Sequence, residues 1–120
     1  MTDHEKQRLG VMANTEIAAV KDIILKTVDC ERIYLFGSYA YGTPQEDSDY
    51  DFYVVLQDNA EQPIDVMENI YWSLRLIKHK TPVDILAEHK STFDDMSLLP
   101  TMERKIVREG VLLYDITGIA

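Results

Sequence analysis

Residues 37–56, GSYAYGTPQEDSDYDFYVVL, place a Gly-Ser pair, a polar loop and an apolar segment in close succession. The last eight letters, DYDFYVVL, are rich in aromatic and β-branched side chains, which favours a strand with a buried face. Asp is a poor strand former, yet Asp49 and Asp51 stand at the start of this strand. Because side chains at i and i+2 of a strand lie on one face, we predict that the two carboxylates point together and that Tyr50 points to the other face.

Helical and strand patterns alternate along the rest of the chain. Apolar residues at helical spacing predict one helix from Asn14 to about residue 30, capped by Asn14 or Thr15, and another that begins at Pro63. The remaining expected elements are strands at 32–38 and 81–88, a short helix opened by Ser91 and Asp94 as a capping pair, a helix over 99–109, and a strand or packed tail at 111–115. With three or four strands, this order predicts one domain over residues 1–120, in which helices cover a small sheet.

The helix that begins at Pro63 carries an apolar stripe of six side chains: Ile64, Met67, Ile70, Tyr71, Leu74 and Ile77. We expect this stripe, together with Trp72, to pack in the core rather than to bind a partner. The apolar stripes of the two longer helices could equally serve a homodimer, and the sequence leaves this open.

The composition limits the classes of partner. The chain has 12 basic and 21 acidic residues, a formal net charge of -9, and 46% hydrophobic residues. Such a charge argues against non-specific binding to DNA or RNA, which needs Lys and Arg to displace counterions. The single cysteine, Cys30, forms no intramolecular disulfide and suits a reducing compartment. The charged N-terminus and the absence of a long apolar run predict a cytoplasmic protein without a membrane span.

A third acid, Asp84, lies between Val83 and Ile85 in an otherwise apolar strand. An Asp at such a position is costly unless it is paired, hydrogen-bonded or bound to metal, although a solvent-facing edge strand would also accommodate it. If this strand lies beside residues 49–56, Asp84 can join Asp49 and Asp51. Hard oxygen ligands without a Cys or His cluster favour Mg²⁺ or Mn²⁺, and such a trio can hold two ions.

A calcium loop is a competing interpretation of the same acids. Asp47, Asp49 and Asp51 match the first ligand positions of an EF-hand. The position that requires Gly is Phe52, and the twelfth position is Asp58 instead of Glu. We therefore reject the calcium loop.

The Gly-Ser pair is informative because of its spacing in sequence from the acids. Gly37 follows a predicted strand and precedes one expected helical turn, SYAY, closed by Gly42. A residue without a side chain lets a phosphate approach the free N–H groups at the start of a helix, and Ser38 can add a hydroxyl. Gly37-Ser38, ten further residues and then Asp49-Tyr50-Asp51 form the pattern G-S-x10-D-x-D.

This pattern, with Asp84 on a later strand, resembles the DNA polymerase β-like nucleotidyltransferase superfamily, and in particular its minimal nucleotidyltransferases, the group related to kanamycin nucleotidyltransferase. The resemblance covers roughly residues 14–115 and implies an α+β fold with a small mixed β-sheet flanked by helices. It implies that Gly37 and Ser38 contact a nucleoside triphosphate, with ATP the expected donor. It further implies that Asp49, Asp51 and Asp84 hold two Mg²⁺ ions and that Asp84 helps to deprotonate the acceptor hydroxyl, so that a nucleoside monophosphate is transferred.

The sequence departs from the family at two positions. Many relatives carry Arg in the segment after Gly-Ser, where this chain has Tyr39 and Tyr41. Tyr cannot neutralise phosphate as Arg does, and at least one of the two is expected to be a packing residue. Lys78, Lys80, Arg32 or a partner protein are the candidates for the missing charge.

Minimal members of the family often act beside a HEPN-domain partner as the antitoxin of a toxin–antitoxin pair. The resemblance therefore implies a HEPN toxin as a candidate acceptor of AMP. A second hypothesis keeps the antitoxin role but makes the chain a catalytically weak binding module that acts by contact alone. The three acids favour the enzyme, because a binding surface has no need of them.

Overall fold

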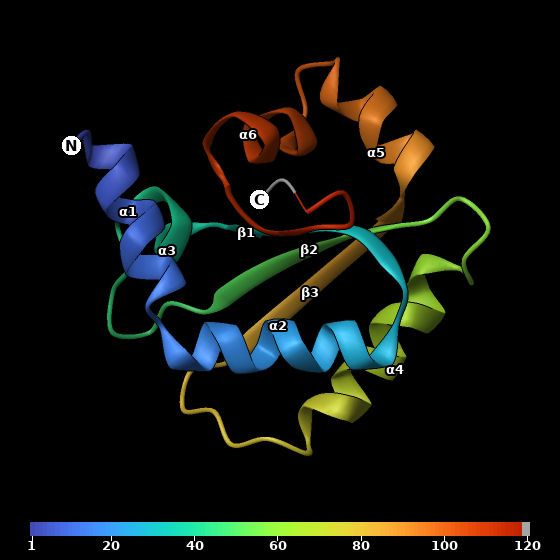
Figure 1. Ribbon diagram of the computed structural model, residues 1–120, viewed down its shortest axis with the longest axis horizontal. Coiled ribbons are helices and arrows are strands. Elements are labelled where there is room, and N and C mark those ends of the chain that lie inside the picture. The colour runs from blue at the N-terminus through green and yellow to red at the C-terminus, as the bar shows by residue number, and fades with distance from the viewer. Residues whose placement is uncertain (119–120) are drawn as a thin grey trace.

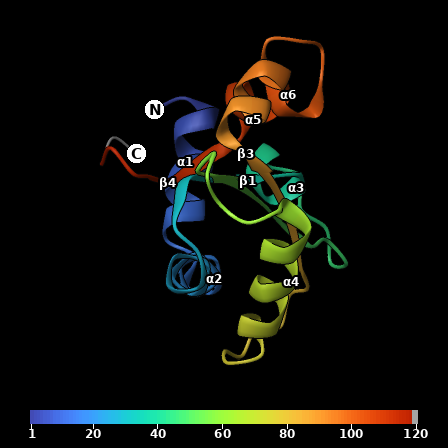
Figure 2. The same ribbon diagram turned by 90° about the vertical axis from the view of Figure 1, so that its right-hand side faces the viewer.

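The computed structural model of the protein describes residues 1–118, which form six helices and four strands. The helices are α1 (Asp3–Met12), α2 (Thr15–Thr27), α3 (Ser38–Tyr41), α4 (Pro63–Leu74), α5 (Lys90–Ser97) and α6 (Met102–Glu109). The strands are β1 (Cys30–Phe36), β2 (Tyr50–Leu56), β3 (Val83–His89) and β4 (Val111–Asp115). The strands lie in one sheet in the order β3-β2-β1-β4, between two layers of helices (Figures 1 and 2).

The sheet is mixed, as the resemblance implied. Strand β1 pairs antiparallel with both β2 and β4, whereas β2 pairs parallel with β3. A parallel pair needs a crossover connection, and α4 supplies it between β2 and β3. The predicted α+β class with a small mixed β-sheet is therefore confirmed.

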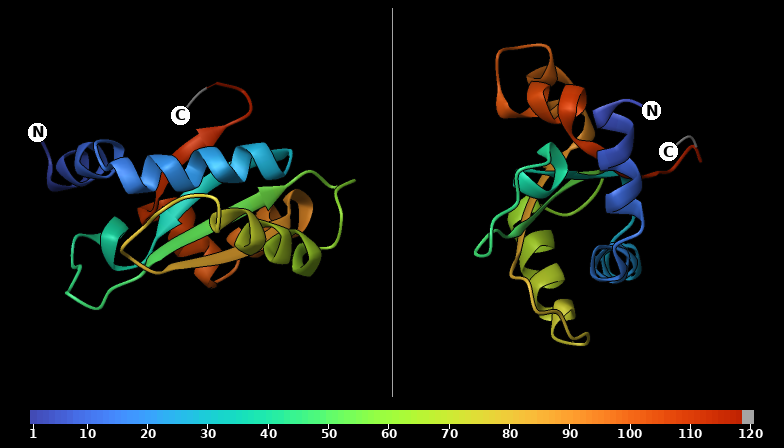
Figure 3. Two further views of the ribbon diagram at one scale, coloured as in Figure 1. Left: turned by 90° about the horizontal axis from the view of Figure 1, so that it is seen from below. Right: turned by 90° about the vertical axis from the view of Figure 1, so that its left-hand side faces the viewer.

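The two faces of the sheet pack against different helices. On one face, Phe52, Val54 and Leu56 of β2 are fully buried in the cluster to which α2 and α4 contribute their apolar sides. On the other face, Tyr53 and Val55 pack in a smaller cluster with Phe93 of α5 and Ile106 of α6. Figure 3 shows α2 and α4 together over one face of the sheet. Alternate residues of β2 thus serve two separate cores, as expected for a central strand.

Most of the predicted elements are present, with small shifts at their ends. Helix α2 begins after Asn14, whose side chain accepts a hydrogen bond from the Ile17 amide at 3.0 Å, so the cap is Asn14. Helix α6 begins only at Met102, because Pro100 precedes it and Thr101 caps it. The tail at 111–115 is the edge strand β4, and Cys30 is buried.

Helix α1 was missed by the sequence analysis. Its start is fixed by a capping box: the Thr2 hydroxyl accepts from the Glu5 amide at 3.1 Å, and Glu5 accepts in return from the Thr2 amide at 3.3 Å. Only Val11 of this helix is buried, so its apolar pattern was too weak to detect. Helix α1 lies against α3, the helical turn of the Gly-Ser segment (Figure 1).

Two other expectations were wrong. Ser91 and Asp94 are no capping pair, because Ser91 hydrogen-bonds to Asp58 and Asp94 pairs with Arg32. Ile64 and Trp72 do not pack in the core, and their exposed fractions are 68% and 61%. Helix α4 instead buries Val66, Ile70 and Leu74.

Among the described residues, no helix has both the length and the apolar character that a membrane crossing requires.

Candidate active site

The parallel register of β2 and β3 brings two of the predicted acids side by side. Asp51 is the direct partner of Asp84, one row after the pairing of Tyr50 with Val83. Paired residues of adjacent strands project from the same face, and Asp51 alternates with Phe52, which faces α2 and α4. The Asp51 side chain therefore lies on the α5–α6 face of the sheet. Asp49, two residues earlier, precedes β2 directly.

Two of the three carboxylates, those of Asp51 and Asp84, have a raised pKa. Asp51 is half-buried, and burial first, then the charges of Asp84 and Asp49, raise the pKa of its carboxyl. Partial desolvation, the charge of Asp49 and a hydrogen bond with Asp49 raise the pKa of Asp84. No cation relieves this repulsion, because none of the three acids forms an ion pair with any residue in 1–118. Clustered acids without a cation are what a divalent ion would stabilise.

The donor set suits a hard divalent ion, since it consists of carboxylate oxygens alone. In the described range, however, no three Asp, Glu, His or Cys side chains are close enough to enclose an ion in their present positions. The backbone register thus brings the acids to one place, while their side chains are not arranged as a finished metal cage. The chemistry of the donors fits Mg²⁺ or Mn²⁺.

Gly37 lies directly against the Asp51 carboxylate. Its φ is +74° with ψ of -163°, a conformation that residues with a side chain rarely adopt. A Cβ at this position would overlap Asp51 Oδ2 and would lie 3.0 Å from its Cγ. Both the backbone conformation and the close approach of Asp51 therefore require glycine.

The SYAY segment forms the expected helical turn, α3, between Gly37 and Gly42. The amides of Ala40 and Tyr41 donate to the Gly37 carbonyl at 3.0 and 2.9 Å. The first N–H groups of a helix have no partner within it, so those of Ser38 and Tyr39 are the ones that α3 can offer to a ligand. They stand at the end of β1, next to the carboxylates.

Tyr39 and Tyr41, where the resemblance leads one to expect Arg, have different surroundings. Tyr39 packs on Tyr50, with ring centroids 4.6 Å apart, so the prediction that at least one of them is a packing residue is confirmed. Tyr41 is half-buried, and burial is the main cause of its raised pKa, to which the charges of Glu109 and Asp51 contribute. Lys105 of α6 places its Nζ 4.6 Å from the centre of the Tyr41 ring. A positive charge therefore stands beside Tyr41, on the same face of the sheet as Asp51.

Lys105 was not among the cations that the sequence suggested. Arg32 is engaged elsewhere, because its guanidinium donates to Asp94 at 2.6 Å and to the Tyr34 hydroxyl at 3.3 Å. Lys78 and Lys80 lie exposed in the segment between α4 and β3. No local signal marks Lys105, which stands 64 residues after Tyr41 and is brought to it only by the fold.

The start of β2 is held by a polar network that the sequence did not reveal. The Tyr50 hydroxyl donates to Glu16 at 2.9 Å and accepts from the Asn14 side chain at 3.3 Å. The other Glu16 oxygen accepts from the Lys80 amide at 2.6 Å. The hydrogen bonds from the Lys80 amide and the Tyr50 hydroxyl lower the pKa of Glu16, and that from Lys80 has the larger effect. The network ties α2 and the loop before β3 to the start of β2, where Asp49 and Asp51 flank Tyr50.

Comparisons with known proteins agree with this geometry. The family model described as "Polymerase beta, Nucleotidyltransferase" matches residues 18–117. A crystal structure of an inferred nucleotidyltransferase from Sulfolobus solfataricus superposes with a TM-score of 0.57 at 18% identity, covering 98% of this chain and 91% of that one. A crystal structure of a toxin–antitoxin with AMP-PNP gives a TM-score of 0.50 at 18% identity, covering 82% of this chain and 72% of that one. No curated protein sequence matches the chain.

Proposed function

The chain belongs to the polymerase beta nucleotidyltransferase family, and from this premise we propose that it transfers AMP from ATP to an acceptor hydroxyl with the help of divalent cations. The observation that carries the proposal is the pairing of Asp51 with Asp84, with Asp49 beside them and Gly37 against Asp51. The acids and the Gly-Ser turn meet at one end of the sheet, and this end is where a triphosphate and a metal would have to meet.

Asp49, Asp51 and Asp84 would hold two Mg²⁺ ions, with Mn²⁺ as an alternative. When bound, such ions neutralise phosphate charge and lower the pKa of a coordinated hydroxyl. Asp84, the most exposed of the three acids, accepts the proton of the acceptor hydroxyl. The hydroxyl oxygen forms a bond to the α-phosphorus, the bond from that phosphorus to the bridging oxygen breaks, and pyrophosphate leaves.

The triphosphate is bound by α3 and its surroundings. The Ser38 hydroxyl and the amides at the start of α3 donate hydrogen bonds to phosphate oxygens. Lys105 supplies the positive charge that relatives carry on Arg, because its Nζ lies 4.6 Å from the ring of Tyr41. Lys is suited to this role as a point charge, although it lacks the bidentate geometry of Arg.

The acceptor that we favour is a hydroxyl on a partner protein, a HEPN-domain toxin for which this chain is the antitoxin. The likeness to a toxin–antitoxin structure with AMP-PNP supports a partner of that class, and the family resemblance supplies its HEPN identity. Both proteins would then act in the cytoplasm.

The experiment incubates the protein with ATP labelled at the α-phosphate, Mg²⁺ and the product of the adjacent gene. We expect label on that product, and none with the Asp49→Asn/Asp51→Asn double variant. Asp47→Asn is the matched control, because Asp47 is an exposed acid in the loop just before the site. A tight complex that never acquires label with any nucleotide would refute the transferase proposal and favour an antitoxin that acts by contact alone.

A further inference from the structure

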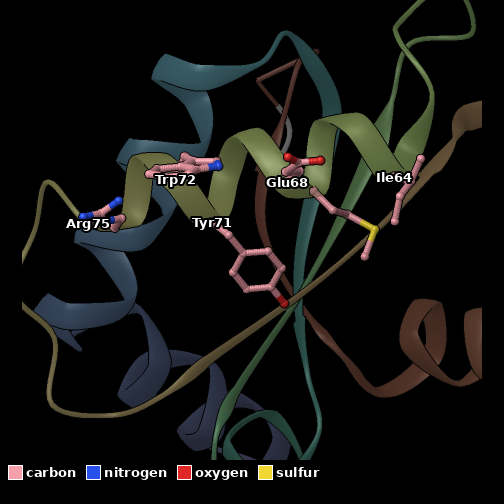
Figure 4. A pocket seen from close by; sticks show the side chains of 6 residues that line it. Ile64, Glu68, Tyr71, Trp72 and Arg75 are labelled. Atoms are coloured by element: carbon pink, nitrogen blue, oxygen red, sulfur yellow. The ribbon is translucent and has the colours of Figure 1, made fainter.

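The outer face of α4 is apolar and uncovered. We use the name α4 face for the groove lined by Ile64, Met67, Glu68, Tyr71, Trp72 and Arg75, which Figure 4 shows along one side of the helix. Ile64 is 68% exposed and Trp72 is 61% exposed. Large apolar side chains gathered in one place on a surface mark an interaction site more often than single ones do.

Two contacts hold the α4 face in a fixed shape. The Tyr71 hydroxyl accepts a hydrogen bond from the amide of Ile85 at 2.8 Å, so Tyr71 points toward the edge strand β3 (Figure 4). The guanidinium of Arg75 lies 4.7 Å from the centre of the Trp72 ring. These contacts orient Tyr71 and Trp72 before binding, which lowers the conformational entropy that their ordering would otherwise cost.

The charges of the α4 face are arranged symmetrically about its centre. Glu68 and Arg75 are seven residues, or two helical turns, apart, with Tyr71 and Trp72 midway between them. Within residues 1–118, neither Glu68 nor Arg75 forms an ion pair. A surface with opposite charges at equal distances from its centre is complementary to its own copy turned by 180°.

We propose that the α4 face binds the α4 face of a second copy of this chain, with the two helices antiparallel about a two-fold axis. In that register Glu68 of each copy faces Arg75 of the other, as an isologous interface requires. This register also places Tyr71 and Trp72 of both copies beside the two-fold axis. The central aromatic side chains and the charge pairs thus fit one register.

The interface leaves the candidate active site open. Helix α4 covers the sheet face of Phe52 and Val54, whereas Asp51 lies on the opposite face. The net charge of -9 opposes self-association at long range, but salt screens this repulsion beyond about 8 Å under physiological conditions. The contacts across α4 therefore decide whether the dimer forms.

The test uses charge reversal and sedimentation equilibrium. We expect the wild type to sediment with twice the mass of a single chain, and the variants Glu68→Arg and Arg75→Glu each to fall to the single-chain mass. Mixing these two variants should restore the double mass, because one partner then contributes only arginines and the other only glutamates. The double variant Glu68→Arg/Arg75→Glu should also dimerise.

Arg8→Glu and Glu46→Arg are matched controls, since both residues are exposed and lie outside α4. They should leave the mass unchanged. A wild type that stays at the single-chain mass at about 100 µM, well above the Kd of a stable dimer, would overturn the proposal and leave the α4 face to a different protein. A dimer that persists in both single variants, or a mixture that stays monomeric, would overturn it as well.

Discussion

Replacement of Gly37 by Ala tests whether this glycine holds the site together. Two separate effects add up at this position. The φ of +74° with ψ of -163° is a conformation that is nearly restricted to glycine, and a side chain there costs about 1–3 kcal/mol. The new methyl group would also overlap Asp51 Oδ2, and such overpacking costs about 1–3 kcal/mol more. We expect the free energy of unfolding to fall by about 2–6 kcal/mol in total.

The assay is urea and thermal unfolding followed by circular dichroism, together with nucleotidyl transfer at a temperature where the variant is folded. A loss of this size lowers the Tm by about 8 °C or more. Activity should be lost even in the folded variant, because Asp51 must move to make room. In the double variant Gly37→Ala/Asp51→Ala the overlap with the carboxylate is gone, so the two substitutions should be less than additive.

Two other glycines serve as controls. Gly42 has a φ of +87°, but a Cβ there would meet only the end of the flexible Gln7 side chain, so Gly42→Ala should cost about 1 kcal/mol. Gly10 lies in α1 with nothing within 4 Å, and Gly10→Ala should stabilise by about 0.5–1 kcal/mol. If Gly37→Ala costs no more than Gly42→Ala and keeps its activity, the close approach of Gly37 to Asp51 does not matter for function.

The remaining predictions concern charge. Asp51→Asn should abolish transfer yet raise the free energy of unfolding at pH 7, which urea unfolding measures. Folding raises the pKa of Asp51 above its unfolded value of 3.8. The free energy of unfolding of the wild type therefore falls as the pH rises through the interval between these two pKa values, and this fall should be smaller in Asp51→Asn. Lys105→Ala should raise the KM for ATP by about tenfold, because the free energy of one charge-assisted hydrogen bond corresponds to about that change in affinity. Lys26→Ala on α2 is the control and should leave the KM unchanged. An unchanged KM in Lys105→Ala would remove this residue from the triphosphate site.

The meeting of Asp51 and Asp84 could be anticipated from the sequence, whereas the role of the acids as metal ligands stays a prediction. Strand alternation predicted that Asp49 and Asp51 share a face, although Asp49 itself lies just before β2. The apolar neighbours of Asp84 marked it as a residue that is costly without a partner. What the sequence could not give was the register. The direct pairing of Asp51 with Asp84 depends on which residues of β3 pair with which residues of β2, and this long-range register leaves no local signal in the sequence.

Other features escaped prediction for identifiable reasons. Helix α1 had a usable signal, since Thr2 and Glu5 fit the capping-box pattern, but its single buried residue gave no apolar stripe. The exposure of Trp72 could not be predicted from the sequence. The apolar pattern of a helix shows which side chains are apolar, but it does not show how many of them the core has room to cover. In the structure, Val66, Ile70 and Leu74 fill the space that α2 and the sheet offer to α4. The other apolar side chains of α4 are therefore left at the surface.

The departure of this chain from its family at Tyr41 has a different meaning in space than in sequence. In sequence, Tyr41 stands where the resemblance leads one to expect Arg, so the turn proposed to bind phosphate lacks a charge. In the fold, helix α6 lies beside this turn, and Lys105 of α6 stands over the Tyr41 ring. A ring also binds a cation through its face, so on our proposal Tyr41 would position the ammonium group that takes the place of the guanidinium. On this reasoning Tyr41→Phe keeps the ring and should keep the KM for ATP, whereas Tyr41→Ala frees Lys105 and should raise the KM as Lys105→Ala does. Equal KM values for Tyr41→Ala and the wild type would show that the lysine needs no ring to hold it.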